Sequence, residues 1–565
     1  MVADLIRDAP FGQLVRYITH NRIFKYAEEQ DDWTCPCVYS QQKQTSPVDS
    51  SSASYTGDNE QTNQPPDLEI NPKEQQQVPV KTGSGQSLPL QLKKRDDEII
   101  LVDWYSTDDP QNPQNWSTQK KIATTFIICF YTFVVYSGSS VYVTSEQGVS
   151  QEFGVSHMQS SLGLVLFVLA YGTGALLFSP MSEIPSLGRN IPYAVTFGLF
   201  VIICIPTALI DSFSGLLGLR FLLGFLGSPC LATGGASFQD IYSFLSLPLG
   251  LTSWVASAYA GPAIGPVLSV FATQAEGWRW FQWVNFFMAV PSFILLFFLL
   301  PETSSSNILL KRAHRLRIRT GKTNIKSQSE IDQSNMSTRS VLWNSLIKPF
   351  QITLLDPAVL YTNLYTAFIY GIYYSFFEVF PIVYGQIYGF SESATAVTFT
   401  SIVASAFIGI AIYISYIVFY MTPDIKKNGL RVQEHRLIPA LFFVCFLPVG
   451  LFIFGWTSNS DIHWIVSVIG LVIFGAAAFV MMQCLFMYIP LSYPKYAASL
   501  FAANSFLRSA MASGSIIFSQ PMYGNLGVGR GVSILGGLSV IGVIGMFVLY
   551  FCGAKLRAMS KFADK

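Results

Sequence analysis

Twelve long apolar stretches constrain this chain more than any other feature of its sequence. About 20 apolar residues in a helix cross a bilayer, and a helix satisfies its own backbone groups where lipid offers no hydrogen bonds. Six stretches precede a polar segment and six follow it, at residues 122–145, 160–180, 191–210, 214–238, 248–271, 281–300, 358–385, 395–420, 437–456, 464–489, 496–518 and 531–552. The sequence therefore predicts an all-α integral membrane protein with twelve transmembrane helices in two six-helix bundles.

The low share of charged residues agrees with a membrane protein. Only 12% of the 565 residues are charged and 51% are hydrophobic, whereas about a quarter of the residues of a soluble domain are charged. The net charge of +1 gives the chain no general affinity for polyanions, so we expect no nucleic-acid partner. The expected surrounding of the twelve stretches is the lipid bilayer.

Neither the cysteines nor the glycine-containing loops predict a metal, cofactor or nucleotide site. Six cysteines lie in apolar stretches, and Cys35 and Cys37 have no second pair and no histidine nearby. Gly321-Lys322-Thr323 resembles the end of a phosphate-binding loop, but Leu316 stands where that loop requires a glycine. We therefore expect a transporter rather than an enzyme, with no bound cofactor and with an ion gradient as its energy source.

The composition divides the chain into five segments. Residues 40–94 are rich in Ser, Gln, Pro and Asp, which predicts disorder because so few apolar residues cannot offset the entropy of ordering. The predicted segments are a largely disordered N-terminal tail of residues 1–121, a six-helix bundle of residues 122–300, a central loop of residues 301–357, a second six-helix bundle of residues 358–552 and a C-terminal tail of residues 553–565.

Lysine and arginine predict the orientation of the chain in the membrane. The loops on the side of the N-terminal tail are basic, whereas the opposite side holds only Arg279 and Arg530. Because basic residues concentrate in cytoplasmic loops, both termini are predicted to be cytoplasmic. The first 25 residues combine a ragged helical periodicity with basic residues. This pattern is typical of a helix on the inner membrane surface, or of a short helix packed on the protein's own loops.

The fifth apolar stretch carries the most unusual local pattern. Pro262 and Pro266 lie inside it, and a membrane helix tolerates proline where neighbouring helices re-satisfy the freed backbone groups. Small residues recur every four positions and form a stripe that another helix approaches closely. The stripe consists of Ser253, Ser257, Gly261, Gly265 and Ser269. The stretch is predicted to be a bent, tightly packed helix in the interior.

Arg220 in the fourth stretch is a candidate for proton coupling. An ionisable residue inside the membrane is costly and usually faces a cavity or a partner. Arginine stays charged at any physiological pH, so it does not carry the proton itself, but it holds a carboxylate or an anionic group of the substrate. The structural alternative is an arginine that extends to the membrane surface. Gly224 and Gly227 lie on or beside the same helix face.

Glu378 in the outer half of the seventh stretch is the candidate proton carrier. It lies among aromatic and aliphatic residues, and an apolar surround favours the protonated form of a carboxyl group. It would then exchange one proton in each transport cycle. The alternative is a hydrated carboxylate at the outer rim, paired with Arg530.

The loop between the second and third stretches is a candidate gate. Glu183, Gly188 and Arg189 can hold helix ends together by charge and capping bonds and release them when the two halves rock. Arg508 in the eleventh stretch lies near Asn504, and we expect it to serve helix packing. Aromatic residues of the seventh stretch are candidates for the substrate cavity, namely Tyr365, Tyr370, Tyr373, Tyr374 and Phe377.

Together these patterns resemble the major facilitator superfamily, and within it the twelve-span drug:proton antiporters of fungi, close to the Candida-type multidrug resistance transporters. The resemblance covers about residues 103–560. It rests on Asp109-Pro110 to Trp116-Ser117, on the loop ending Gly188-Arg189, on Arg220 with Phe221, Gly224 and Gly227, and on Gly261-Pro262 to Gly265-Pro266. Glu183 stands where the general pattern has aspartate, and Pro266 where many relatives have a second glycine.

The resemblance implies the major facilitator fold and transport by alternating access. It implies that Arg220 takes part in proton coupling and that the motif of the fifth stretch marks an exporter. The expected function is proton-coupled efflux of small, mostly apolar xenobiotics such as azole antifungals, by a monomer in the plasma membrane. The alternative is a proton-coupled transporter of a physiological solute such as a polyamine or a sugar. A non-transporting membrane sensor on the same fold is a third possibility.

Overall fold

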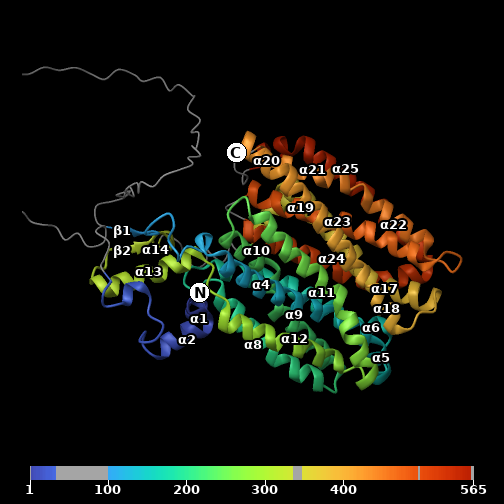
Figure 1. The fold of residues 1–565 in the computed structure, drawn as a ribbon. Helices are drawn as coiled ribbons and strands as arrows, with labels where there is room; N and C mark the ends of the chain where they lie inside the picture. The colour runs from blue at the N-terminus through green and yellow to red at the C-terminus, as the bar shows by residue number, and fades with distance from the viewer. Residues whose placement is uncertain (1, 34–98, 335–346, 430, 494–496, 561–565) are drawn as a thin grey trace, which may run out of the picture.

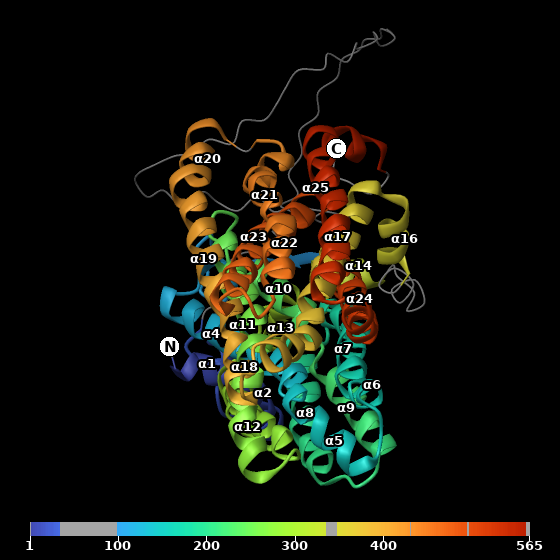
Figure 2. The same ribbon diagram turned by 90° about the vertical axis from the view of Figure 1, so that its right-hand side faces the viewer.

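Long apolar helices form two groups that lie side by side along most of their length (Figure 1). The computed structural model describes residues 2–33, 99–334, 347–429, 431–493 and 497–560. The segment 40–94, predicted to be disordered, lies outside the described residues. Figure 2 views the molecule from one end and separates the C-terminal half, in orange and red, from the N-terminal half, in blue to green.

The N-terminal half contains the first six predicted stretches. Its elements are α4 (Thr118–Ser140), η3 (Val143–Ser145), α5 (Glu146–Phe153), α6 (His157–Ser160), α7 (Leu162–Glu183), α8 (Asn190–Leu209), α9 (Phe213–Gly227), α10 (Pro229–Ile241), α11 (Leu247–Glu276) and α12 (Trp280–Leu299). The fourth stretch is divided between α9 and α10, which follow one another with only Ser228 between them.

The C-terminal half contains the other six. Its elements are α17 (Pro357–Phe380), η4 (Pro381–Ile387), α18 (Glu392–Thr398), α19 (Thr400–Tyr416), η5 (Ile417–Met421), α20 (Thr422–Asn428), η6 (Gln433–Leu437), α21 (Ile438–Phe443), α22 (Phe446–Thr457), α23 (Trp464–Ser492), α24 (Ala497–Leu526) and α25 (Val528–Met559). The segments η4 and η5 are π-helical.

Eleven helical segments of the described chain are long and apolar enough to cross a membrane. The stretch predicted at residues 496–518 forms the remaining long helix, α24, which packs against α7 and α17. Its serines, Asn504 and Arg508 make it more polar than the others. The predicted all-α membrane fold is confirmed.

Capping residues set several helix boundaries. The carboxylate of Asp356 accepts hydrogen bonds from the backbone N–H groups of Ala358 and Val359 at the start of α17, which satisfies donors that have no partner inside the helix. Pro357 occupies the first position, where a missing N–H costs nothing. Gly277 ends α11 with a φ of 91°, a conformation that glycine adopts without the steric cost of a side chain.

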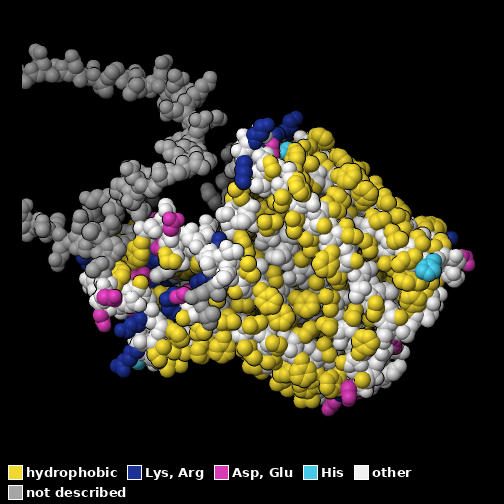
Figure 3. All heavy atoms as spheres, viewed as in Figure 1, with side chains coloured by type: hydrophobic (Ala, Val, Ile, Leu, Met, Phe, Trp, Pro, Cys, Tyr) yellow, Lys and Arg dark blue, Asp and Glu magenta, His cyan; other side chains and the backbone are white. Residues whose placement is uncertain are grey.

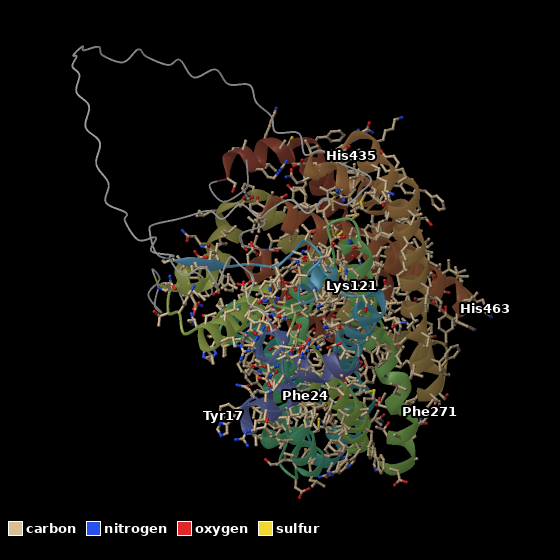
Figure 4. The ribbon with its side chains drawn as sticks, turned by 60° about the vertical axis from the view of Figure 1, so that its left-hand side comes forward. Tyr17, Phe24, Lys121, Phe271, His435 and His463 are labelled. Carbon is tan, nitrogen blue, oxygen red and sulfur yellow. The ribbon has the colours of Figure 1, made fainter. Side chains whose placement is uncertain are left out.

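The outer surface of the bundle is apolar over most of its length. Figure 3 shows hydrophobic side chains over the bundle and charged side chains at its ends and on the tail. Phe271 on α11 is 58% exposed and Phe551 on α25 is 72% exposed, and Phe271 lies on the outside in Figure 4. A surface of this kind is stable in contact with lipid rather than water.

The tail and the central segment fold together at one end of the bundle. The tail contains α1 (Val2–Asp8), α2 (Pro10–Ile18), η1 (Ala27–Glu29), β1 (Ile100–Val102) and η2 (Pro113–Asn115), and the central segment contains α13 (Ser305–Thr320), β2 (Ile325–Ser327), α14 (Gln328–Ser334) and α16 (Lys348–Leu355). Strands β1 and β2 pair in parallel. The predicted disorder of the tail thus does not extend to residues 2–33 and 99–121.

The first helices pack on the protein itself, which is one of the two arrangements considered for them. The ring of Phe11 lies against Phe297 and Phe298 of α12, with ring centroids 6.1 and 4.7 Å away. The backbone oxygen of Asp8 accepts a hydrogen bond from the N–H of Glu302. Tyr17 of α2 points outward and is 82% exposed (Figure 4).

Candidate functional site

A cavity of about 850 Å³ lies between the two halves. Helices α5, α6 and α18 lie at one end of the bundle, whereas the folded tail with β1, β2 and α13 lies at the other (Figure 1). We name these the far end and the tail end. The cavity is at the far end and is lined by residues of α5, α6, α11, α17, η4, α18 and α24. Its walls are mainly apolar and include Phe377, Ile382, Phe390, Phe399 and Pro521.

Two buried carboxyl groups line this cavity, one from each half. Glu146 begins α5 and is 4% exposed, and Glu378 of α17 is 5% exposed. Oε1 of Glu146 has no hydrogen-bond partner in the described structure, and its Oε2 lies 3.8 Å from Nε2 of His157. No hydrogen bond or ion pair of Glu378 occurs among the described residues. Two buried acids without a cation in contact cannot both hold their charge cheaply, so the cavity is suited to accepting protons.

The pairing of Glu378 with Arg530, considered as the alternative to a proton carrier, is not what the structure shows. Arg530 is exposed near the start of α25 and forms no ion pair with the described residues. Glu378 instead shares the cavity with Glu146. The hydrated-rim alternative does not fit either, because Glu378 is buried.

Arg220 lies on α9, entirely buried, and binds backbone oxygens. Its guanidinium donates to the carbonyl oxygens of Gly163 at 3.1 Å, Gly138 at 2.8 Å and Ser139 at 3.2 Å. The rings of Tyr142 and Phe167 flank it, with centroids 4.8 and 4.5 Å away. The expectation that Arg220 holds a carboxylate or a substrate group directly is therefore wrong here, and so is the alternative of an arginine extending to the surface.

Arg220 nevertheless influences the cavity through its charge and through the chain segment that it positions. It is close enough to Glu146 for an electrostatic interaction. It also fixes the end of α4 against the start of α7, because the three carbonyl groups that it binds belong to these two helices. Arg220 thereby positions the chain that leads from Ser139 to Glu146.

A layer of tyrosines lies beneath the cavity, one to two helical turns towards the tail end along α17. The hydroxyl of Tyr171 lies 2.7 Å from that of Tyr370 and donates to that of Tyr374 at 3.1 Å. Tyr374 also lies 3.2 Å from Oγ of Ser139. Because Tyr171 and Ser139 belong to the N-terminal half, these hydrogen bonds join the two halves.

The structure places the five aromatic candidates of the seventh stretch in different surroundings. Phe377 lines the cavity, and Tyr370 and Tyr374 belong to the layer. Tyr373 donates to the backbone oxygen of Tyr259 on α11 at 3.2 Å. Tyr365 lies elsewhere: it packs on Gly542 of α25, on the side of α17 that faces its own half. Helical spacing explains this, since residues five apart face different directions.

The small-residue stripe of α11 lies on α4, as a closely approached interior helix requires. A Cβ at Gly265 would overlap Oγ of Ser140, and one at Gly261 would lie 2.7 Å from Cβ of Tyr136. Oγ of Ser137 donates to the backbone oxygen of Gly261 at 3.0 Å. The stripe therefore joins two helices of the same half. Pro262 is buried inside the continuous helix, and Pro266 lines the cavity.

The opposite face of α11 meets the C-terminal half. The ring of Tyr259 lies against Phe479 of α23, with centroids 5.4 Å apart, and its hydroxyl lies 3.3 Å from Sδ of Met482. Tyr259 of α11 thus contacts the C-terminal half, whereas Gly261 and Gly265 of the motif face α4.

The predicted gating loop forms its ion pair within the N-terminal half. Arg189 donates to Oδ2 of Asp240 on α10 at 3.1 Å and to Oγ of Ser182 at 3.0 Å. The carboxylate of Glu302 accepts hydrogen bonds from the N–H groups of Arg189 and Asn190. Burial alone would lower the pKa of Arg189, but Asp240 raises it above its ordinary value. Gly188 has a φ of 70°, which favours glycine in this turn.

Glu183 is not the main partner of Arg189. It is exposed at the end of α7 and forms no hydrogen bond or ion pair with the described residues. Sequence reasoning missed Asp240 and Glu302, which perform the charge pairing and capping assigned to the loop. It also missed Glu146, which follows the first predicted stretch by one residue. The sequence feature that could have identified Glu146 is an acidic residue directly at the end of an apolar stretch.

Arg508 of α24 lies where the halves meet, and Asn504 performs the packing. The amide of Asn504 donates to Oδ1 of Asn363 at 2.9 Å and to Oγ1 of Thr366 at 2.7 Å, which joins α24 to α17. Arg508 faces the rings of Tyr370 and Phe486 instead. No group of three or more His, Cys, Asp or Glu side chains in the described chain is placed to hold a metal ion.

The molecule thus consists of two halves of long helices with a cavity between them. Each half contributes a buried acid to this cavity, and the proline-containing helix α11 lines it. Residues 128–519 match the Major Facilitator Superfamily. The chain belongs to this superfamily. Membership in a superfamily of membrane transporters explains the apolar bundle and the cavity between its halves. The protein is a transporter and not an enzyme.

Known proteins resemble the chain in sequence and in fold. The MFS-type transporter pyvG of Aspergillus violaceofuscus is 41% identical over 82% of this chain and 86% of its own length. The Cycloheximide resistance protein of Candida maltosa is 35% identical over the whole of both chains. The crystal structure of the human organic anion transporter MFSD10 (TETRAN) shares the fold with a TM-score of 0.56, at 15% identity over 76% of this chain and 100% of that one. The resemblance to fungal drug transporters of the superfamily is confirmed.

Proposed function

We propose that the chain is a proton-coupled exporter of small, mostly apolar xenobiotics, including antifungal compounds of the cycloheximide and azole kinds. It acts as a monomer in the plasma membrane, with both termini in the cytoplasm. The proton gradient is its energy source and it needs no bound cofactor. Similarity to the Cycloheximide resistance protein over the full length of both chains supports drug export.

The observation that carries the proposal is the cavity with a buried acid from each half. Its volume of about 850 Å³ lies within the range of pockets that enclose drug-sized molecules. Its apolar walls suit hydrophobic cargo, whereas Glu146 and Glu378 are the only acids buried in its lining. Buried acids in a membrane are expensive and mark ion pathways.

Proton coupling follows from the positions of the two acids. In the proposed orientation the far end faces the outside, so external protons reach Glu146 and Glu378 through the cavity. A proton on either acid removes the cost of a buried charge in the arrangement shown, where neither acid forms an ion pair with a described lysine or arginine. Protonation and cargo binding then favour opposite orientations of the halves. Each ligand shifts the equilibrium by its differential affinity for the two orientations.

The proposal is tested by energised efflux from yeast cells that lack their own drug pumps. Cells expressing the chain are loaded with a fluorescent apolar cargo, and export is followed with and without a protonophore while ATP is held constant. We expect the protonophore to abolish export. Cells expressing Glu378→Gln, at equal surface abundance, serve as the matched control and are expected to export little even without the protonophore.

Other results of this experiment distinguish the competing functions. Export that persists with the protonophore rejects proton coupling. Failure to export a broad panel of xenobiotics, together with uptake of a polyamine or a sugar, rejects drug efflux in favour of transport of a physiological solute. Absence of any flux rejects transport itself.

A further inference from the structure

Arg508 is a buried cation without a counter-ion among the described residues. Its side chain is 6% exposed, and it lies eleven residues into α24, about 16 Å along the helix axis from its first residue. No carboxylate forms an ion pair with it among the residues that the structure describes. An uncompensated charge at this depth is costly, so its presence calls for a function.

The guanidinium is also short of acceptors. Its NH2 group donates to Oγ of Ser505 at 3.2 Å, and the hydroxyl of Tyr136 is a second partner. Its Nε–H is buried and meets no acceptor in the described structure. A guanidinium has five N–H groups in a planar fork, an arrangement that matches the two oxygens of a carboxylate. Arg508 thus keeps hydrogen-bonding capacity that the protein does not use.

Five of the six other buried arginines among the described residues have oxygen partners, whereas Arg436 donates to Sδ of Met421. Ion pairs join Arg16 to Glu29, Arg189 to Asp240, Arg312 to Asp109 and Arg315 to Glu28. Arg220 has three backbone oxygens instead. Besides its two hydroxyl partners, Arg508 is flanked by aromatic faces, with the ring centroids of Tyr370 and Phe486 at 5.1 and 5.3 Å.

The position of Arg508 places it on the route between the halves. It lines a void of about 20 Å³ with residues of both halves, among them Tyr136, Trp254, Tyr259 and Met482. The void lies at the level of the tyrosine layer, because Arg508 contacts Tyr370. It is too small for cargo here. Under alternating access it widens when the halves separate at the tail end, and Arg508 then faces the cytoplasmic route into the protein.

We propose that Arg508 is the cargo-recognition cation of this exporter, and that it selects cargo presenting a carboxylate or carbonyl oxygen over cationic cargo. The inference rests on the proposed export function and names its substrate class. An oxygen of the cargo accepts a charge-assisted hydrogen bond from Arg508. It thereby provides the acceptor that Arg508 lacks within the described protein. The surrounding aromatic rings hold the apolar body of the cargo.

The test uses two dyes with the same three-ring skeleton and opposite charge. Fluorescein carries a carboxylate and rhodamine 123 carries a cation. The purified full-length chain is reconstituted into proteoliposomes, and export of each dye is measured under an imposed pH gradient without a membrane potential. The wild type is compared with Arg508→Gln, with Arg508→Lys, which keeps the charge, and with Arg530→Gln, which removes one exposed charge at the far end.

We expect Arg508→Gln to reduce fluorescein export by about tenfold or more, the equivalent of losing one charge-assisted hydrogen bond, and to leave rhodamine 123 export equal or higher. Arg508→Lys keeps part of the fluorescein export, and Arg530→Gln changes neither dye. Equal loss of both dyes in Arg508→Gln, or no loss of either, overturns the proposal.

Binding of fluorescein to the purified protein, followed by its anisotropy, separates this proposal from the proposed function. If the wild type binds fluorescein and Arg508→Gln weakens that binding, the recognition role stands even where no proton-driven export is found. If fluorescein binds both proteins with equal affinity, the recognition role is rejected, whatever the export assay gives. The melting temperatures of the variants confirm that each is folded.

Discussion

Arg220 and Arg508 are both buried arginines inside the membrane-spanning bundle, yet their surroundings differ. Arg220 is held by three backbone oxygens of α4 and α7 and by aromatic rings within one half. Arg508 lies between the halves, bonded to the hydroxyls of Ser505 on its own helix and Tyr136 on α4, and its Nε–H meets no acceptor among the described residues. A cation with an acceptor for each of its three guanidinium nitrogens serves the architecture, whereas one with a buried nitrogen that lacks an acceptor is available to a ligand.

The contrast predicts that removing Arg220 is the most damaging single change. Arg220→Gln removes three buried hydrogen bonds from a charged donor, worth about 1.5–3 kcal/mol each, and releases the end of α4 from α7. We expect a lower melting temperature and loss of export of every cargo. Arg508→Gln is the matched control, with a melting temperature close to that of the wild type. If Arg220→Gln is as stable as the wild type, the architectural role of Arg220 is wrong.

Glu146 is next in expected effect, because it lies near Arg220 but faces the cavity. Glu146→Gln keeps the shape and removes the acid, so accumulation of cargo against a pH gradient is expected to disappear, with little change in stability. Glu152→Gln on the same short helix is the control, since Glu152 is exposed and pairs with Arg279. Transport assays in proteoliposomes measure both. If Glu146→Gln accumulates cargo against the gradient as well as the wild type does, Glu146 is not required for proton coupling.

Gly265→Ala tests whether the stripe on α11 supports the site of Arg220. The added methyl group overlaps Ser140, adjacent to Ser139, whose carbonyl Arg220 binds. Overpacking of this kind typically costs about 1–3 kcal/mol, and we expect export to fall about tenfold. Gly537→Ala on α25 has open space around its Cβ and is expected to be neutral. Equal export by the two variants would show that the close approach of α4 and α11 is dispensable.

A third buried arginine, Arg312, has carboxylate partners and lies outside the membrane, so its loss is expected to affect transport least. Asp109→Asn breaks its ion pair with Arg312, which loosens the contact of the tail with α13. Proteolysis of the tail is expected to accelerate while export changes by less than about twofold. Breaking a buried pair costs about 3–5 kcal/mol, and here the cost falls on the contact between the tail and α13. Limited proteolysis and efflux assays measure the two effects.

The same pair has a predictable pH dependence. Burial alone would raise the pKa of Asp109, but its hydrogen bond and charge interaction with Arg312 lower it below the ordinary value of 3.8. The stabilising contribution is therefore present above pH 3.8 and is lost only as the pH falls through the lowered pKa. Tail proteolysis of the wild type should stay slow between pH 7 and 5. An increase within that range contradicts the assignment.

Local patterns of the sequence predicted the features that interactions between neighbouring residues determine, namely the helices and their packing faces. The apolar stretches gave the helices, because length and hydropathy suffice for a span. The four-residue spacing of the stripe on α11 predicted close helix packing, since residues four apart share one face. The partner of the stripe, α4 rather than the other half, was not contained in this spacing, because it depends on how distant helices assemble.

The site was predicted less completely for the same reason. Glu378 was found because it stands alone among apolar residues, whereas Glu146 was passed over at the boundary of a predicted stretch. Nothing in the sequence places these residues, 232 positions apart, in one cavity. The partners of Arg220 are backbone oxygens, which every residue has, so no residue type in the sequence could indicate them.

The most direct test of the account is whether cargo movement drives protons through the two acids. Purified protein is reconstituted with a pH-sensitive dye inside the vesicles, and a cargo gradient is imposed without a pH gradient. We predict that the wild type moves protons against the direction of cargo flow, and that the double variant Glu146→Gln, Glu378→Gln does not. Cargo flux in the wild type without any proton movement, or proton movement unchanged in the double variant, would contradict the account.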